Sequence, residues 1–138
     1  MRVPDKGPHS EIERNCGIFE MHAFIIEDEY LIAQSLRDML ERLGFDQFSF
    51  ARSEDVAVQG VGDHPIDLIT ADVRLLPGDG VEAVEAIGAK RQVPVIFITG
   101  YADELKDRAP DAIVIQKPIE PDQLATAVKA AVPNFARA

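Results

Sequence analysis

The sequence predicts an α/β fold built on a doubly wound parallel sheet, and three observations carry that prediction. Short apolar runs alternate with segments in which apolar residues recur at helical spacing. The run at residues 66–71 is dominated by Ile and Leu, which is typical of a central strand covered on both faces. Each pair of strand and helix takes roughly 20 to 25 residues, as expected for βα units joined by right-handed crossovers.

The first two units are predicted from helix-boundary signals as well as from periodicity. A strand at residues 23–26 is followed by a helix with a regular apolar stripe, which Gly44 should end. Alternating apolar and polar residues predict a second strand around residues 48–50. Ser53 then predicts the N-cap of a weak helix that runs to about Val61.

The other three units follow the same pattern. Their predicted strands and helices are residues 66–71 and 81–87, residues 94–98 and 103–108, and residues 112–115 and 121–131. The fourth helix is at best two turns long, because Pro110 follows it closely. Together the units predict a flavodoxin-like (βα)5 doubly wound parallel sheet with strand order 2-1-3-4-5.

The two ends of the chain differ from this body. Residues 1–21 carry several prolines and glycines among scattered charges, so we expect a flexible N-terminal tail. A start of translation at Met21 would make residues 1–20 an extension of the natural protein. We expect residues 22–135 to form one domain, with no output domain attached, because the chain ends at Ala138 soon after the last helix.

Composition excludes several classes of function. The chain has 138 residues and a formal net charge of −10, whereas nucleic-acid binding needs clustered Lys and Arg, so we expect no direct nucleic-acid partner. No apolar run approaches the ~18 to 20 residues of a membrane span, and no signal peptide is evident, so we expect a cytoplasmic protein without a membrane partner. Cys16 is the only cysteine, which excludes an internal disulfide.

Polar residues gather where the predicted strands end. Under the order 2-1-3-4-5, Glu27, Asp28 and Asp72 converge from the first and third strands, and Thr99 and Lys117 arrive from the next two. Three close carboxylates are tolerable only if protons or a divalent cation offset their charge, and an all-oxygen site suits Mg²⁺. Such a set could hold a phosphoryl group on Asp72.

These five side chains, in this order, resemble the phosphoacceptor site of the receiver domain of bacterial two-component response regulators. The resemblance covers residues 21–132 and implies that a sensor histidine kinase phosphorylates Asp72. It also implies that Thr99 and Lys117 contact the phosphoryl group, and that the Lys117-Pro118 bond is cis.

The same resemblance implies how the Mg²⁺ ion is held. Asp28 and Asp72 would bind it directly, Glu27 through water, and Arg74 through its backbone carbonyl. Gly78 and Gly80, by contrast, are predicted to be turn residues, because neither a P-loop nor a dinucleotide fingerprint is present.

The segment 97–101 also resembles the receiver subgroup named for its Phe-Ala-Thr-Gly pattern and the receivers of general-stress-response regulators, although Ile98 replaces the Ala. Many receivers have an aromatic switch residue where this sequence has Val114, so the usual aromatic coupling cannot be transferred. Lys117 follows Thr99 by only 18 residues, which implies a reduced fourth helix that could become ordered on phosphorylation.

A second hypothesis concerns the lifetime of the phosphoryl group. Bulky Arg74 and Tyr101 lie two residues beyond Asp72 and Thr99, and side chains at these positions flank the route of a hydrolytic water molecule. We therefore expect slow loss of the phosphoryl group. Tyr101 is equally compatible with a role in recognition and with a role in packing over the loop.

The sequence therefore predicts a single-domain response regulator that is not an enzyme. It would signal to an unidentified protein partner through the face made by the fourth helix, fifth strand and last helix, or act as a phosphate sink. Two alternatives remain open. One is a pseudo-receiver that binds partners without phosphorylation. The other is an aspartyl-phosphate phosphatase, but such an enzyme needs a second acid where this sequence has Arg74.

Overall fold

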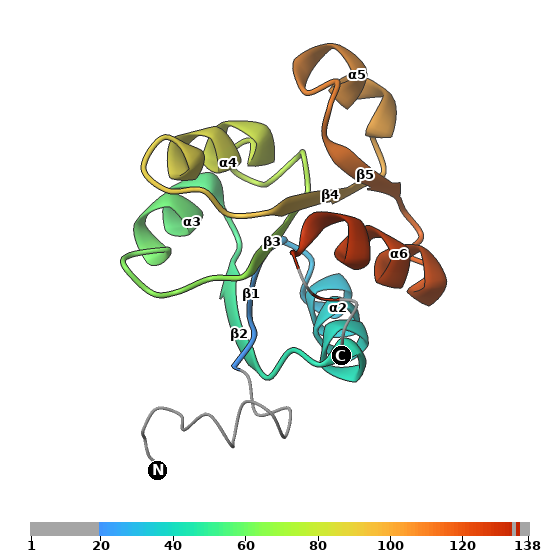
Figure 1. Ribbon diagram of the computed structural model, residues 1–138. Coiled ribbons are helices and arrows are strands. Elements are labelled where there is room, and N and C mark those ends of the chain that lie inside the picture. The colour runs from blue at the N-terminus through green and yellow to red at the C-terminus, as the bar shows by residue number, and fades with distance from the viewer. Residues whose placement is uncertain (1–19, 134, 136–138) are drawn as a thin grey trace.

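The computed structural model describes residues 20–133 and residue 135. Nineteen residues of the predicted N-terminal tail, with Cys16 among them, lie outside these described residues. The described chain forms one five-stranded parallel sheet with the order β2-β1-β3-β4-β5, which confirms the predicted fold class and order (Figure 1). The strands are β1 (His22–Ile26), β2 (Gln47–Ala51), β3 (Leu68–Ala71), β4 (Val95–Thr99) and β5 (Ile113–Gln116).

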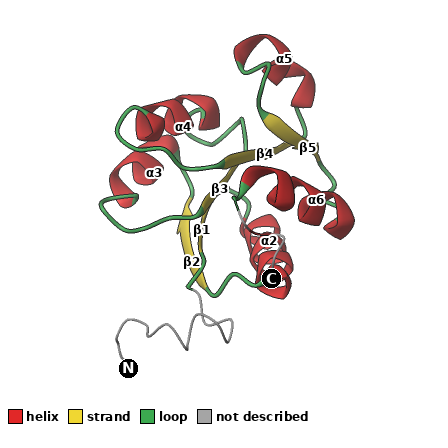
Figure 2. Ribbon diagram, in the orientation of Figure 1, coloured by secondary structure: helices red, strands yellow, loops and turns green. Residues whose placement is uncertain are grey.

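Helices cover both faces of this sheet, as Figure 2 shows. They are α2 (Tyr30–Leu43), α3 (Glu54–Gly60), α4 (Gly80–Gly88), the 3-10 helix η1 (Ala102–Glu104), α5 (Leu105–Arg108) and α6 (Pro121–Ala131). The short η1 and α5 together form the reduced fourth helix that the sequence predicts. Within the described residues, no helix is long and apolar enough to cross a membrane.

Alternation along the strands divides the interior into two apolar clusters. One cluster lies beneath α2 and α6 and includes Ile25, Leu36 and Leu124. The other lies beneath α3, α4 and α5 and includes Ile69 and Phe97. Because both faces of the central strands are buried, backbone pairing there fixes where each strand ends, and therefore where the polar residues after it lie.

Helix ends follow the predicted signals in most places. Gly44 ends α2 with a left-handed backbone at φ 117°, and the Ser53 side chain accepts a hydrogen bond from Val56 N at the start of α3. The third strand is shorter than predicted. Asp67 lies just before β3, where its side chain accepts a hydrogen bond from the backbone N–H of His22 (2.8 Å).

Candidate functional site

Backbone hydrogen bonds continue just past the ends of the strands and hold the site residues in place. Asp72 N donates to Ile26 O (3.0 Å), Glu27 N donates to Ala51 O (2.9 Å), and Lys117 N donates to Thr99 O (2.9 Å). Each of these bonds ties a residue after one strand to the neighbouring strand. These bonds therefore hold Glu27, Asp72 and Lys117 at one edge of the sheet.

Lys117 bridges two buried carboxylates. Its Nζ atom lies 2.8 Å from Asp72 Oδ2 and 3.0 Å from Glu27 Oε1. Burial alone would lower the pKa of Lys117, but the hydrogen bonds to Asp72 and Glu27 outweigh it, and the pKa is raised. The lysine is therefore a fixed cation in the site.

Burial of this pair raises the pKa of the Glu27 carboxyl above its usual value, and the hydrogen bonds from Lys117 and Glu29 N compensate only in part. Glu27 is 4% exposed, so water contributes little to the solvation of its carboxylate. Negative charge at this position is thus only partly offset by the protein itself.

One oxygen each from Glu27, Asp28 and Asp72 lies within 4.8 Å of the others. Asp28 Oδ2 accepts a hydrogen bond from Leu76 N (3.0 Å), whereas the buried Asp72 Oδ1 has no hydrogen-bond partner among the residues that the structure describes. A buried carboxylate oxygen without a donor is costly in an apo site and suits a hard cation. The donor set is all oxygen, so it fits Mg²⁺.

Thr99 is fully buried at the end of β4. Its Oγ1 accepts a hydrogen bond from the backbone N–H of Tyr101 (3.0 Å). The hydroxyl proton is not used in that bond, so Thr99 retains a donor at the end of the strand between β3 and β5.

The β3–α4 loop is packed directly against Asp72. Gly80, predicted as a turn residue, is instead the first residue of α4, and its N–H donates to Val73 O (2.7 Å). A Cβ atom at this position would lie 1.7 Å from Asp72 O. Gly78 is a turn residue as predicted, with φ 113°. The prediction for Gly80 was wrong because only the tertiary fold shows how closely α4 approaches the backbone of Asp72.

The Lys117-Pro118 peptide bond is cis, as the resemblance implies, and Leu76-Pro77 is cis as well. Val114 pairs in register with Phe97 and packs against the cluster beneath α3, α4 and α5. The position of the usual aromatic switch thus holds a small, partly buried aliphatic side chain.

The exposed rim of the site contains contacts that sequence reasoning missed. The Arg74 guanidinium lies over the Tyr101 ring, with 3.8 Å between Cζ and the ring centroid, and it forms an ion pair with Glu104. Arg108 makes two hydrogen bonds to Asp79 (2.9 and 3.0 Å). No sequence signal pairs these loop residues, because their separation has no helical or strand period.

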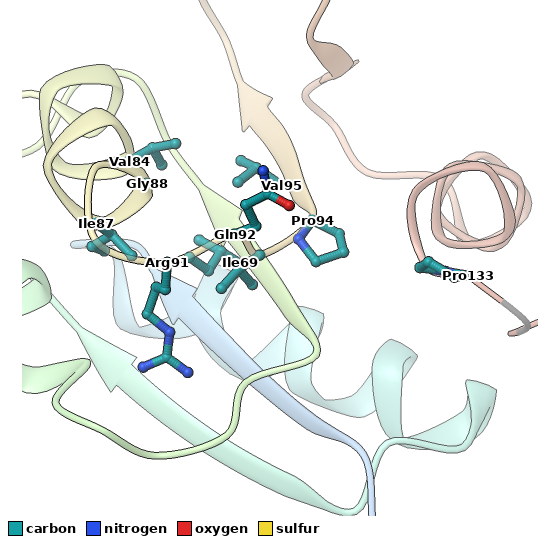
Figure 3. A pocket seen from close by; sticks show the side chains of 10 residues that line it. Ile69, Val84, Ile87, Gly88, Arg91, Gln92, Pro94, Val95 and Pro133 are labelled. Atoms are coloured by element: carbon teal, nitrogen blue, oxygen red, sulfur yellow. The ribbon is translucent and has the colours of Figure 1, made fainter.

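An apolar groove lies away from this edge of the sheet. A groove of about 590 Å³ lies near the amino end of β4, with Ile87, Arg91 and Pro94 around it (Figure 3). Arg91 is held there by hydrogen bonds to the carbonyl oxygens of Gly62 and His64. The groove is mostly apolar and contains none of the predicted site residues.

Comparison with known proteins agrees with the geometry. The family model described as "Response regulator receiver domain" matches residues 23–129. The chain is 36% identical over 112 residues to the phyllosphere-induced regulator PhyR of Methylorubrum extorquens, covering 78% of this chain and 42% of PhyR. It is 33% identical over 115 residues to the transcriptional regulatory protein PdtaR of Mycobacterium tuberculosis, covering 80% and 56%.

Among solved structures, the chain is similar to the receiver domain of Erythrobacter litoralis PhyR. The TM-score is 0.76 at 32% sequence identity, covering 83% of this chain and 91% of that one. By contrast, the chain spans about half the length of the two curated relatives.

Proposed function

The chain belongs to the response regulator receiver family, and on that premise we propose that Asp72 accepts a phosphoryl group from a histidine kinase in a Mg²⁺-dependent reaction. One observation carries the proposal. Asp72 is buried with one oxygen on Lys117 and the other, Oδ1, without a hydrogen-bond partner in the described part of the chain. A buried carboxylate with one oxygen on a fixed cation and the other free of hydrogen bonds can bind a metal ion and still accept a phosphoryl group.

Mg²⁺, when bound, would supply positive charge against the phosphoryl oxygens. Asp28 and Asp72 would hold it directly, Glu27 through water, and Arg74 through its backbone carbonyl. Asp28 needs no large movement for this role, because Leu76 N occupies only its Oδ2 atom.

The protein's own side chains would accept the phosphoryl group and stabilise its oxygens. An oxygen of Asp72 would bond to phosphorus while the phosphorus–nitrogen bond of the phosphohistidine breaks, and the electron pair returns to the imidazole. Lys117 and the Thr99 hydroxyl would donate hydrogen bonds to the phosphoryl oxygens as charge develops there. Thr99 is buried at the end of β4 and the backbone N–H of Lys117 is bonded to Thr99 O, so the positions of both donors are set before the reaction.

We further propose that phosphorylation changes the affinity of the α5-β5-α6 face for a protein partner. Thr99 provides the link, because its Oγ1 also accepts the hydrogen bond from Tyr101 N just before η1. A rotation of Thr99 toward a phosphoryl group would weaken that bond and affect the short η1–α5 segment. A phosphate sink without such a partner is the competing role.

The two alternative functions make different demands on the site. A phosphatase would need an acid in the position of Arg74, and the nearby Glu104 carboxylate is already paired with Arg74. A pseudo-receiver would need no metal, so it would show no Mg²⁺-dependent change in stability or spectra.

Incubation with Mg²⁺ and acetyl phosphate, followed by intact-mass measurement, tests the proposal. We expect one phosphoryl mass increment in the wild type, none in Asp72→Asn, and none in the wild type with EDTA. An increment that persists in Asp72→Asn would overturn the assignment. No increment together with no Mg²⁺ binding would favour the pseudo-receiver.

A further inference from the structure

Three side chains from two loops form a small cluster at the rim of the candidate site. Arg74 leaves the loop after β3, whereas Tyr101 and Glu104 follow β4. The guanidinium lies over the Tyr101 ring and pairs with the Glu104 carboxylate. Arg74 is thus held from two sides by residues of a different loop.

The backbone places this cluster next to Asp72 and Thr99. Arg74 and Tyr101 each lie two positions after a site residue, just past the ends of β3 and β4. The N–H of Tyr101 is bound to Thr99 Oγ1 at 3.0 Å. Arg74 and Tyr101, in contact with each other, therefore span the gap between the ends of β3 and β4.

The 3-10 helix η1 places Glu104 where its carboxylate can reach Arg74. The N–H of Glu104 donates to Tyr101 O (3.0 Å), and this turn places the Glu104 carboxylate where it pairs with Arg74. The next residue, Leu105, is 1% exposed and packs in the core, and Arg108 at the end of α5 forms an ion pair with Asp79. The segment would therefore remain folded without the Glu104 carboxylate.

We infer that Glu104 is a positioning residue, which holds Arg74 against Tyr101 across the water route to Asp72 and so prolongs the life of the aspartyl phosphate. This inference rests on the proposed function, since it concerns a phosphoryl group on Asp72. Glu104 need not touch that group, because it acts through the guanidinium of Arg74.

The reaction that it slows is hydrolysis of the acyl phosphate. The oxygen of a water molecule bonds to phosphorus while the bond between phosphorus and the Asp72 oxygen breaks. The electron pair stays on the carboxylate, inorganic phosphate leaves, and the proton of the water passes to the phosphate. An Arg74 side chain that is free to move would leave the approach of that water open for a larger fraction of the time.

Two variants with the same charge change separate this role from a general effect of charge. Glu104→Gln removes the carboxylate that pairs with Arg74. Asp103→Asn, on the same 3-10 helix, removes a carboxylate that, among the described residues, pairs only with the exposed Lys106 (3.3 Å). Each full-length protein is phosphorylated with acetyl phosphate and Mg²⁺, freed of donor, and followed by intact mass.

Since an exposed ion pair contributes modestly, we expect the half-life of phosphorylated Glu104→Gln to be about two- to fivefold shorter than that of the wild type. Asp103→Asn should match the wild type, and both variants should keep its thermal midpoint. An unchanged or longer half-life in Glu104→Gln would overturn the inference while leaving the proposed function intact. Failure of the wild type to become phosphorylated would overturn both.

A double-mutant cycle shows whether Glu104 acts through Arg74. Arg74→Ala alone should shorten the half-life, and adding Glu104→Gln to it should have no further effect. Additive effects would mean that Glu104 influences hydrolysis by another route, and would contradict the positioning role.

Discussion

Two sets of charged residues share the carboxyl edge of the sheet, and they differ in their contact with water. Glu27 and Asp72 are 4% and 7% exposed and are joined by Lys117. The side chains of Arg74 and Glu104 are 56% and 37% exposed. Charges in the buried set are poorly screened, so we expect them to decide whether the proposed phosphoryl transfer occurs, and we expect the screened charges of the exposed set only to adjust its rates.

The largest effect is expected at Gly80, where α4 approaches the backbone of Asp72 closely. We expect Gly80→Ala to destabilise the protein by at least about 3 kcal/mol, because the new Cβ would overlap Asp72 O. Urea denaturation measures the change, and phosphorylation should be lost with the fold. Gly88→Ala, in the last residue of the same helix, meets no atom within 4 Å and should be neutral or slightly stabilising. Equal effects of the two substitutions would contradict the close approach.

Removal of the buried cation should have the next largest effect. We expect Lys117→Met to slow phosphorylation of Asp72 by acetyl phosphate about 100-fold, because a preorganised donor to the phosphoryl oxygens is lost. Lys129→Met, which changes an exposed lysine on α6, should phosphorylate at the wild-type rate. The rates come from intact-mass time courses at saturating Mg²⁺. A Lys117→Met rate within about threefold of the wild type would mean that Lys117 is only a structural partner of the carboxylates.

Glu27 gives a prediction for pH. Its raised pKa means that the folded protein keeps a proton that the unfolded chain has already lost, so the free energy of unfolding falls as pH rises from about 4.5 through the folded pKa. Without Mg²⁺, Glu27→Gln should remove this fall and be more stable than the wild type at neutral pH. It should also bind Mg²⁺ about tenfold more weakly.

Denaturation at several pH values, with and without Mg²⁺, checks both parts of this prediction. Glu29→Gln provides the matched control, because Glu29 is exposed and it is its backbone N–H that donates to Glu27. A wild-type pH profile parallel to that of Glu27→Gln would show that the burial of Glu27 carries no energetic cost.

The Arg108–Asp79 ion pair, partly exposed to solvent at the same rim, should show the smallest effect. Arg108→Ala removes the ion pair with Asp79, whose side chain also accepts hydrogen bonds from Val81 N and Glu82 N at the start of α4. We expect a loss of only about 0.5 to 1 kcal/mol in urea denaturation, since solvent screens the pair. Lys106→Ala, which loses the exposed Asp103 pair, should be neutral. A loss above about 2 kcal/mol in Arg108→Ala would place this pair with the buried set.

The same division explains how far the sequence could predict the structure. Apolar runs locate the strands, and parallel topology then forces Glu27, Asp72 and Lys117 to one edge, so the buried set was predictable from strand ends alone. Arg74 and Glu104 come from loops whose mutual approach depends on turn geometry, which no periodicity encodes. Gly80 was misinterpreted for a related reason, since its closeness to Asp72 arises only when α4 packs onto the sheet.

The central claim is that the phosphoryl group resides on Asp72, and chemical trapping tests it most directly. Borohydride reduces an aspartyl phosphate to homoserine, which tandem mass spectrometry of a peptide digest can locate. After incubation with acetyl phosphate and Mg²⁺, we predict homoserine at position 72 and at no other carboxylate. Homoserine at position 28, or none in a protein that had gained the phosphoryl mass, would contradict the account.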